Sequence, residues 1–303
     1  MKRPIPGQKH HWFPKVMAKA WVDSEGKVSR TNSRSFTTQK HPSAVGYYPD
    51  HHNILSDGGS PWDSTFEPDF DDADNAFPKV IGWLGEIASS HPSGKRIGGV
   101  TISSEMRTKL AECLASLVVR SPRMRYLSEK YTAEYQVEWM GFDEPRNVHQ
   151  TAGANLRRCQ EPFARSIRTG GKFAFLVATE GSFVFGDGFM SNFNPSPDCR
   201  SNLMALTAFT PSVAVLWFSP RQYPSYPEGV TILVSKDEVV QFNDIVQVYS
   251  KDNIFHRGVA PKLHEAFLEG QHYIVTSNGA NHTTPLVEGW MFEALQVRED
   301  RRA

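Results

Sequence analysis

The sequence predicts a single α+β domain in which a helix-rich N-terminal half packs on a mainly antiparallel, β-rich C-terminal half. Between residues 78 and 169, apolar residues recur at spacings of three and four, the helical period. After residue 170 the pattern changes to short apolar runs separated by glycine and proline, which is typical of strands. The 303 residues are 39% hydrophobic, with seven Trp and nineteen Phe, enough to bury a full core. We therefore expect one domain over 1–303, with a helical sub-region at 1–169 and a β-rich sub-region at 170–303.

The first 78 residues combine short elements with irregular chain. The spacing of apolar residues predicts a short helix entered through Pro14, then a turn at residues 23–26 and a short strand from Lys27 to Arg30. The stretch 32–78 is rich in Ser, Pro, Gly, His and Asp and has little periodicity. We expect a long ordered loop there, and its length favours a functional role.

Three longer helices follow, at residues 78–90, 104–120 and 147–168. The middle helix has the clearest pattern, with one broad apolar face. Ser103 is placed to cap its first turn, and Pro122 is expected to end it.

The second half of the chain reads mainly as strands. The turn at 179–181 between the first two apolar runs predicts a hairpin. A helix is expected to begin near Ser235 and to continue through Val246. The predicted strands cover residues 173–178, 182–185, 203–209, 213–218, 230–234, 272–276 and 290–297.

Charge and cysteine content narrow the class of protein. Basic and acidic residues balance at 33 each, so no net field announces nucleic acid or a membrane as partner. Three widely spaced cysteines form neither a disulfide framework nor a metal-binding pair. The opening residues lack the apolar segment of a signal peptide, and no apolar run has the length of a membrane span. We expect a cytoplasmic protein without a membrane partner.

Several standard chemistries are excluded by their motifs. The sequence contains no phosphate-binding GxxxxGK[ST] loop, no GxGxxG, no HExxH and no GxSxG. The acidic run at 69–74 lacks the glycine of a calcium-binding loop and reads as a solvated loop. Asp50, His51 and His52 are weak candidate ligands for a divalent metal, which is the only cofactor that the residues suggest.

Two groups of polar residues are candidates for chemistry near the N-terminus and the middle helix. His10 and His11 lie in an extended segment where neighbouring side chains point to opposite sides, so one of them is expected to face a site. Arg120, Arg123 and Arg125 surround the end of the 104–120 helix. They either complement the helix dipole and nearby carboxylates or bind a phosphate or carboxylate of a substrate.

Two further candidates lie in the β-rich half. Asp187 follows a predicted strand and stands between two glycines, where a ligand or metal has room to approach, although the same pattern is common in tight turns. Asn243, on the late helix, is a candidate orienting amide. We expect His10 or His11 to converge on Asp187 and Arg120.

These residues together resemble a known family. The segments in question are Lys9–Lys15, with its His-His-x-x-Pro pattern, then Arg120–Arg123, Phe183–Asp187 and Val240–Asn243. In that order they are similar to the motifs of domain-of-unknown-function family 4238. The sequence departs from that family at Gly186, where the family has serine, and at Phe189, where it has proline. The resemblance implies a mostly bacterial, soluble protein and brings no activity with it.

Two functions from different classes fit these observations. The first is a metal-assisted hydrolase of phosphate esters or nucleic acid, in which His10, His11, Arg120, Asp187 and Asn243 supply the chemistry and Arg123 and Arg125 bind substrate. The second is a non-catalytic binding or effector module, such as a toxin-like or phage-defence component, whose partner is another protein. A third interpretation is that the polar set only ties the two halves of the fold together.

Overall fold

The computed structural model describes residues 4, 6–61, 63–191, 204–219, 227–273 and 285–297. The fold is α+β, as predicted, with helices packed around mixed and antiparallel sheets. None of the helices in this described part of the chain has the length and apolar character that crossing a bilayer requires.

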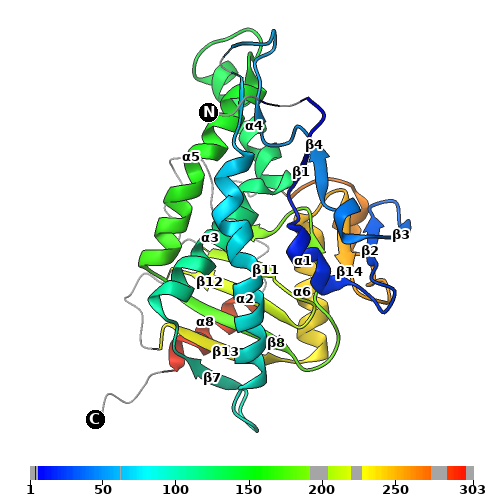
Figure 1. The fold of residues 1–303 in the computed structure, drawn as a ribbon, viewed down its shortest axis with the longest axis vertical. Coiled ribbons are helices and arrows are strands. Elements are labelled where there is room, and N and C mark those ends of the chain that lie inside the picture. Colours follow the sequence, from blue (N-terminus) through cyan, green and yellow to red (C-terminus); the bar gives the residue numbers. More distant parts are fainter. Residues whose placement is uncertain are drawn as a thin grey trace.

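The larger sheet has six strands in the order β10-β11-β12-β8-β13-β7. All neighbouring pairs are antiparallel except β8 and β13, which are parallel. Every residue of β12 is buried, because α2 crosses in front of the strands and α8 lies behind them (Figure 1). The strands are β7 (Ile97–Val100), β8 (Lys172–Ala178), β10 (Met190–Ser191), β11 (Met204–Ala208), β12 (Val213–Phe218) and β13 (Gly229–Val234).

A second, antiparallel sheet joins the N-terminal segment to the C-terminal half of the chain. Its order is β3-β2-β14-β9, so N-terminal strands pair directly with a C-terminal one. Its strands are β2 (Val28–Asn32), β3 (Thr37–Lys40), β9 (Phe185–Gly186) and β14 (Asn253–His256). Two short pairs lie beside it, β1 (Lys9–His11) with β4 (Tyr47–Pro49) and β5 (Asn53–Ile54) with β6 (Ser64–Thr65).

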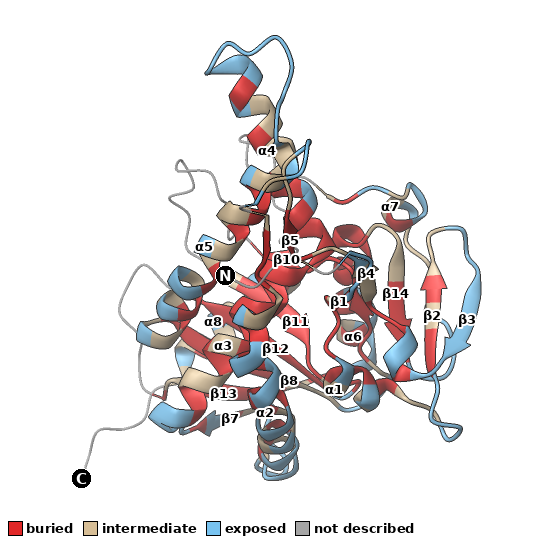
Figure 2. Ribbon diagram, turned by 45° about the horizontal axis from the view of Figure 1, so that its top comes forward, coloured by how far each residue is buried: buried red, intermediate tan, exposed pale blue. Residues whose placement is uncertain are grey.

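The long helices form a layer over the large sheet and extend beyond it at one end. Helices α3 and α5 pack along one another, and α4 continues beside α5 away from the sheet (Figures 1 and 2). The helices are α1 (Lys15–Ala18), α2 (Asp71–Ser89), α3 (Ser104–Arg120), α4 (Pro122–Glu138), α5 (Val148–Thr169), α6 (Lys236–Tyr249), α7 (Glu265–Leu268) and α8 (Pro285–Gln296). Three 3₁₀ turns cover Lys19–Trp21, Pro42–Ala44 and Glu67–Phe70.

Ser121 explains both the end of α3 and the start of α4. Its hydroxyl donates to the Val118 carbonyl at 2.8 Å and accepts the Met124 N–H at 3.1 Å. Pro122 follows at the first position of the new helix, where its fixed φ and missing N–H cost nothing. The prediction that Pro122 ends the helix was therefore right, but the second helix that it begins was not predicted.

Several other expectations were wrong. Residues 290–296 of the predicted strand at 290–297 belong to α8, because apolar residues such as Val287 and Trp290 pack on the sheet at helical spacing. The predicted 173–178/182–185 hairpin does not form, since β8 pairs with β12 and β13 while β9 pairs with β14. Of the predicted strand at 272–276, the two described residues are irregular, and the others lie outside the described residues, as do residue 203 and Cys199.

The 32–78 stretch holds more regular structure than a long loop. Four short strands and two 3₁₀ turns interrupt it, and α2 begins at Asp71 rather than at residue 78. The acidic run therefore ends in the first turn of α2, where Asp71, Asp72 and Asp74 complement the positive end of the helix dipole.

Aromatic packing fixes the N-terminal segment against the second sheet. Phe13 stacks on Phe185 at 4.2 Å between ring centroids and contacts Phe255 at 4.9 Å. Trp12 and Trp21 complete this buried group. Since Trp12 and Phe13 follow β1 directly, this packing sets the position of the two histidines before them.

Candidate functional site

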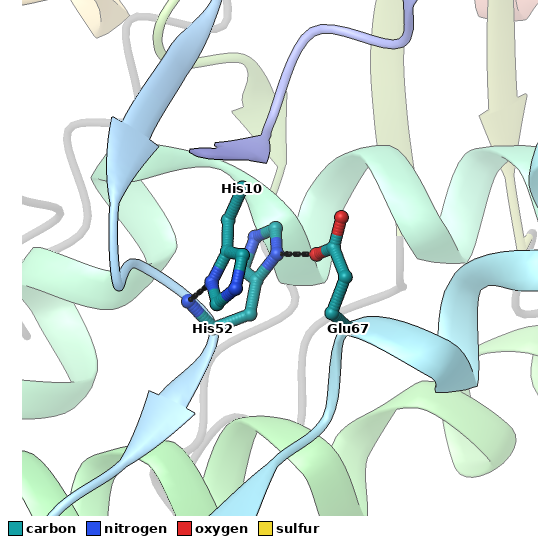
Figure 3. Close-up of side chains that lie close together, drawn as sticks. All are labelled: His10, His52 and Glu67. Atoms are coloured by element: carbon teal, nitrogen blue, oxygen red, sulfur yellow. Dashed lines mark hydrogen bonds and ion pairs between the residues drawn. The ribbon is translucent and has the colours of Figure 1, made fainter. Parts of the chain in front are cut away.

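Three side chains that can ligate a metal converge from separate segments of the N-terminal region. They are His10 on β1, His52 in the turn between β4 and β5, and Glu67 at the start of a 3₁₀ turn (Figure 3). One ligand atom from each lies within 4.8 Å of the other two. The rings of His10 and His52 are stacked nearly parallel, 5.3 Å apart with an interplanar angle of 6°.

Local backbone structure brings His52 to His10. The pairing of β1 with β4 places His10 opposite Tyr48, just before a turn at Asp50. Asp50 adopts a positive φ of 57° there, and its carboxylate accepts the backbone N–H of Gly7 at 3.0 Å and the Asn53 amide at 3.0 Å. Asp50, a candidate metal ligand from the sequence, thus shapes the turn that delivers His52.

Hydrogen bonds give the two clustered histidines different roles. His10 Nδ1 accepts the backbone N–H of His52 at 2.8 Å, so a neutral His10 carries its proton on Nε2. Nδ1 of His52 faces the Glu67 carboxylate, with which it makes a hydrogen bond. The Nε2 atoms of both rings are buried and have no hydrogen-bond partner among the described residues. A buried polar atom without a hydrogen-bond partner costs free energy. Two such atoms in one cluster therefore indicate a site that can take up a ligand.

The electrostatics of the cluster follow from its burial. Burial lowers the pKa of His10, against the opposing effect of the Glu67 and Asp50 carboxylates. It lowers the pKa of His52 well below its usual value, and the positive Arg120 adds to that effect. Burial raises the pKa of Glu67, while Arg120 opposes the rise. The cluster thus holds two neutral imidazoles and a carboxylate, a set that gains by accepting positive charge.

Arg120 is the cation that most affects the pKa values of His52 and Glu67, and it is 1% exposed. Its Nη2 lies 2.9 Å from Asp74 Oδ1, its Nη1 donates to the His11 carbonyl at 3.4 Å, and its guanidinium covers the Phe70 ring at 4.3 Å. Its buried Nε has no hydrogen-bond partner in the described part of the chain. Arg120 thus contacts the His-His segment through the His11 backbone carbonyl.

His11 and His51 lie beside the cluster without joining it. The His11 ring meets Tyr47 edge-on at 5.4 Å, and burial lowers its pKa to about 4. His51 contacts Tyr48 and the ring of His52, with centroids 5.6 Å and 5.1 Å away.

Asp187 and Asn243 form hydrogen bonds within the fold instead. Asp187 is fully buried, and its carboxylate accepts the backbone N–H groups of residues 251, 252 and 253 at 2.7, 2.8 and 2.9 Å. Asn243 accepts the Val184 N–H at 2.9 Å and donates to the Ser182 carbonyl at 3.0 Å. These bonds connect β9 to α6 and to the start of β14. Both side chains thus stabilise a junction within the β-rich half, and these bonds do not tie that half to the helical one.

Arg123 and Arg125 are also held by the fold. Arg123 is buried over the Tyr249 ring at 4.8 Å and donates to the Tyr273 carbonyl at 3.1 Å. Arg125 pairs with Glu129 at 2.5 Å and donates to the His149 carbonyl at 3.1 Å. Both guanidinium groups are thus engaged by protein partners.

Sequence reasoning missed Glu67 and ranked His52 low. The available signal was the acidic, histidine-containing stretch 50–78, which is long enough to suggest function. Nothing in the linear order separates Glu67 from the seven other acidic residues of that stretch, and only the folded loop selects it.

No family model matches the chain, and neither a curated protein nor a solved structure matches it. The resemblance to family 4238 therefore stays a prediction that rests on the residues quoted above. Fold and site together define an α+β protein with a cluster of two buried histidines and one partly exposed glutamate.

Proposed function

We propose that this protein is a metal-assisted hydrolase of phosphate esters that acts at the cluster of His10, His52 and Glu67. The observation that carries the proposal is the convergence of these three side chains, with both ring Nε2 atoms buried and unpartnered among the described residues. An imidazole and a carboxylate that face one another, His52 and Glu67, are donors suited to zinc and to other divalent transition metals, and His10 lies beside them. Arg120 and its orphaned Nε lie next to that set and suit a phosphate oxygen.

The hydrogen bonds assign a different task to each group. His52 and Glu67 face one another and would hold the cation, which would supply Lewis-acid activation of a phosphoryl oxygen. His10, held through Nδ1, directs an Nε2–H that can donate to a substrate oxygen or to the leaving group.

Burial of the cluster narrows the substrate. Because both ring Nε2 atoms are buried and only the Glu67 side chain is partly exposed, at 28%, a small phosphate ester suits the cluster better than a nucleic-acid duplex. The formal net charge of zero also provides no general attraction for a polyanion.

The test measures metal binding and hydrolysis on the same samples. Protein purified without chelator is analysed for bound metal and dialysed against Zn²⁺ or Mn²⁺. It is then assayed with p-nitrophenyl phosphate, its diester and a single-stranded oligonucleotide. We expect His52→Ala and Glu67→Gln to lose stoichiometric metal and to lower hydrolysis about a hundredfold or more. His41→Ala, which removes an exposed histidine, is the matched control. The proposal would be overturned if the wild-type protein bound neither Zn²⁺ nor Mn²⁺, or if the His52→Ala variant kept full hydrolysis.

A further inference from the structure

The end of α4 exposes an unusual concentration of large apolar side chains. Trp139 is 78% exposed, Tyr135 58% and Met140 53%, all within one turn of the helix end and its continuation. Together they border an open groove of about 440 Å³ between α4 and α5, whose far wall is made by Thr151 and Asn155. Aromatic residues and methionine are enriched at protein interfaces, and a tryptophan this exposed is costly without a partner.

The surroundings of this groove are acidic. Glu138, Asp143 and Glu144 are exposed and have no ion pair with any described residue. Arg146 is the one basic residue of the connection from 139 to 147. A phosphate backbone or an anionic lipid surface would be repelled here, while a cationic side chain gains both from the carboxylates and from the faces of Tyr135 and Trp139.

The groove is also held in a fixed shape. The side-chain amide of Gln136 donates to the Arg146 carbonyl at 3.0 Å and accepts the Arg146 N–H at 2.8 Å, and the backbone carbonyl of Gln136 accepts the Phe142 N–H at 3.0 Å. Asn147 is tied to Asp57 by two further bonds, at 2.7 and 3.0 Å. The connection after α4 therefore presents its apolar side chains without a large ordering cost on binding. In Figure 2 this end of α4 and its exposed connection extend beyond the body of the molecule.

We propose that the groove between the end of α4 and α5 is a docking site for a basic segment of another protein. The segment carries arginine or lysine side chains and also an apolar side chain, which serves as its anchor. The anchor packs on Trp139 and Met140, and the cations lie against the acidic rim at Glu138, Asp143 and Glu144. This site is separate from the histidine cluster and does not depend on the proposed hydrolysis.

The test uses fluorescence anisotropy with labelled peptides and the full chain. The probe is a peptide of Arg-Leu-Lys-Phe repeats, compared with a twin in which glutamate replaces each basic residue and a twin in which serine replaces each apolar one. We expect the first peptide alone to bind, with an affinity that falls as salt is raised. Trp139→Ser and the double change Glu138→Lys, Asp143→Lys should each weaken binding about tenfold or more. Phe292→Ser, at a phenylalanine that is 64% exposed on α8, is the matched control and should bind as the wild type does.

Four outcomes would overturn the proposal. These are equal binding of the basic and acidic peptides, unchanged binding by Trp139→Ser, Trp139-dependent binding to phosphatidylserine vesicles or an oligonucleotide instead of the peptide, and Trp139-dependent self-association in sedimentation. The last would identify a second copy of the chain as the occupant. Since all the substituted residues are exposed, far-UV circular dichroism should show unchanged folding in each variant.

Discussion

His10 and His52 are both buried imidazoles, but the direction of their hydrogen bonds separates their chemistry. The backbone N–H of His52 occupies Nδ1 of His10, which makes His10 a donor through Nε2. His52 instead turns Nδ1 toward Glu67 and can share a cation with it. Asp187 was also a candidate site residue in the sequence, but its carboxylate accepts hydrogen bonds from three backbone N–H groups.

This assignment predicts a separation of metal binding from hydrolysis. His10→Asn places an amide oxygen where Nδ1 accepts the His52 N–H, but it removes the Nε2–H donor. We expect the variant to keep its metal stoichiometry and to lose about a hundredfold or more in kcat, the usual scale for a positioned proton donor. Metal analysis and kinetics on the same preparation check this. Loss of metal together with activity would instead make His10 a third ligand.

At the scale of elements, the junction between α3 and α4 is the point on which the position of Arg120 depends. Arg120 is the last residue of α3, and the next residue, Ser121, is both the end of that helix and the cap of α4. Capping by Ser121 explains how two helices follow one another with only one residue between them. It also places the buried Arg120 at the junction of the two helices.

Ser121→Ala is expected to destabilise the protein by about 1–2 kcal/mol, because it removes a helix cap at a buried position. Urea unfolding followed by circular dichroism measures the change. Ser103→Ala, which removes the cap of α3 at its other end, is the comparison: it should cost a similar amount without affecting Arg120. If only Ser121→Ala also reduces phosphate-ester hydrolysis, the junction positions Arg120; equal hydrolysis by both variants would contradict that role.

At the scale of the whole molecule, the second sheet connects the N-terminal segment to the C-terminal half of the chain. Strands β2 and β3 come from the N-terminal segment and β9 and β14 from the C-terminal half, so the sheet forms only when both are in place. The aromatic group around Phe13 and Phe185 then holds β1 against this sheet. The N-terminal histidines are therefore placed by contacts with residues far along the chain.

The stability of the molecule should fall in acid, because several buried histidines must be neutral in the fold. His272 is a clear case: burial lowers its pKa to about 3, against the carbonyl of Tyr249, while Arg123 and Lys251 lower it further. The unfolded chain takes up the proton near pH 6.5, so the contribution of His272 is complete above that pH. It is lost as the pH falls from about 6.5 toward 3.

The variant His272→Asn isolates this effect, since asparagine can donate to Tyr249 but does not titrate in that range. We expect the difference in unfolding free energy between wild type and variant to change by up to about 1.4 kcal/mol per pH unit below pH 6.5. Urea denaturation at several pH values measures it. Two stability curves that run parallel from pH 7 to pH 4 would contradict the prediction.

The local sequence pattern was enough to predict those elements whose structure is decided by their own residues. The α3 helix, with its Ser103 cap, and most strands of the large sheet lie where periodicity and turn residues predicted them, because apolar spacing and capping act over a few residues. The region of α8 was assigned wrongly, since a short apolar run fits a strand or a helix equally well. Packing against β8 and β13 decides between them.

The sequence by itself thus determined the α+β class and singled out His10 and Arg120 as residues of interest. It also suggested that the stretch around His52 was functional. Only the tertiary structure decided that His10 meets His52 and Glu67 rather than Asp187. The physical reason is that a donor set depends on strand pairing and on the path of a loop, neither of which is encoded by the spacing of residues along the chain.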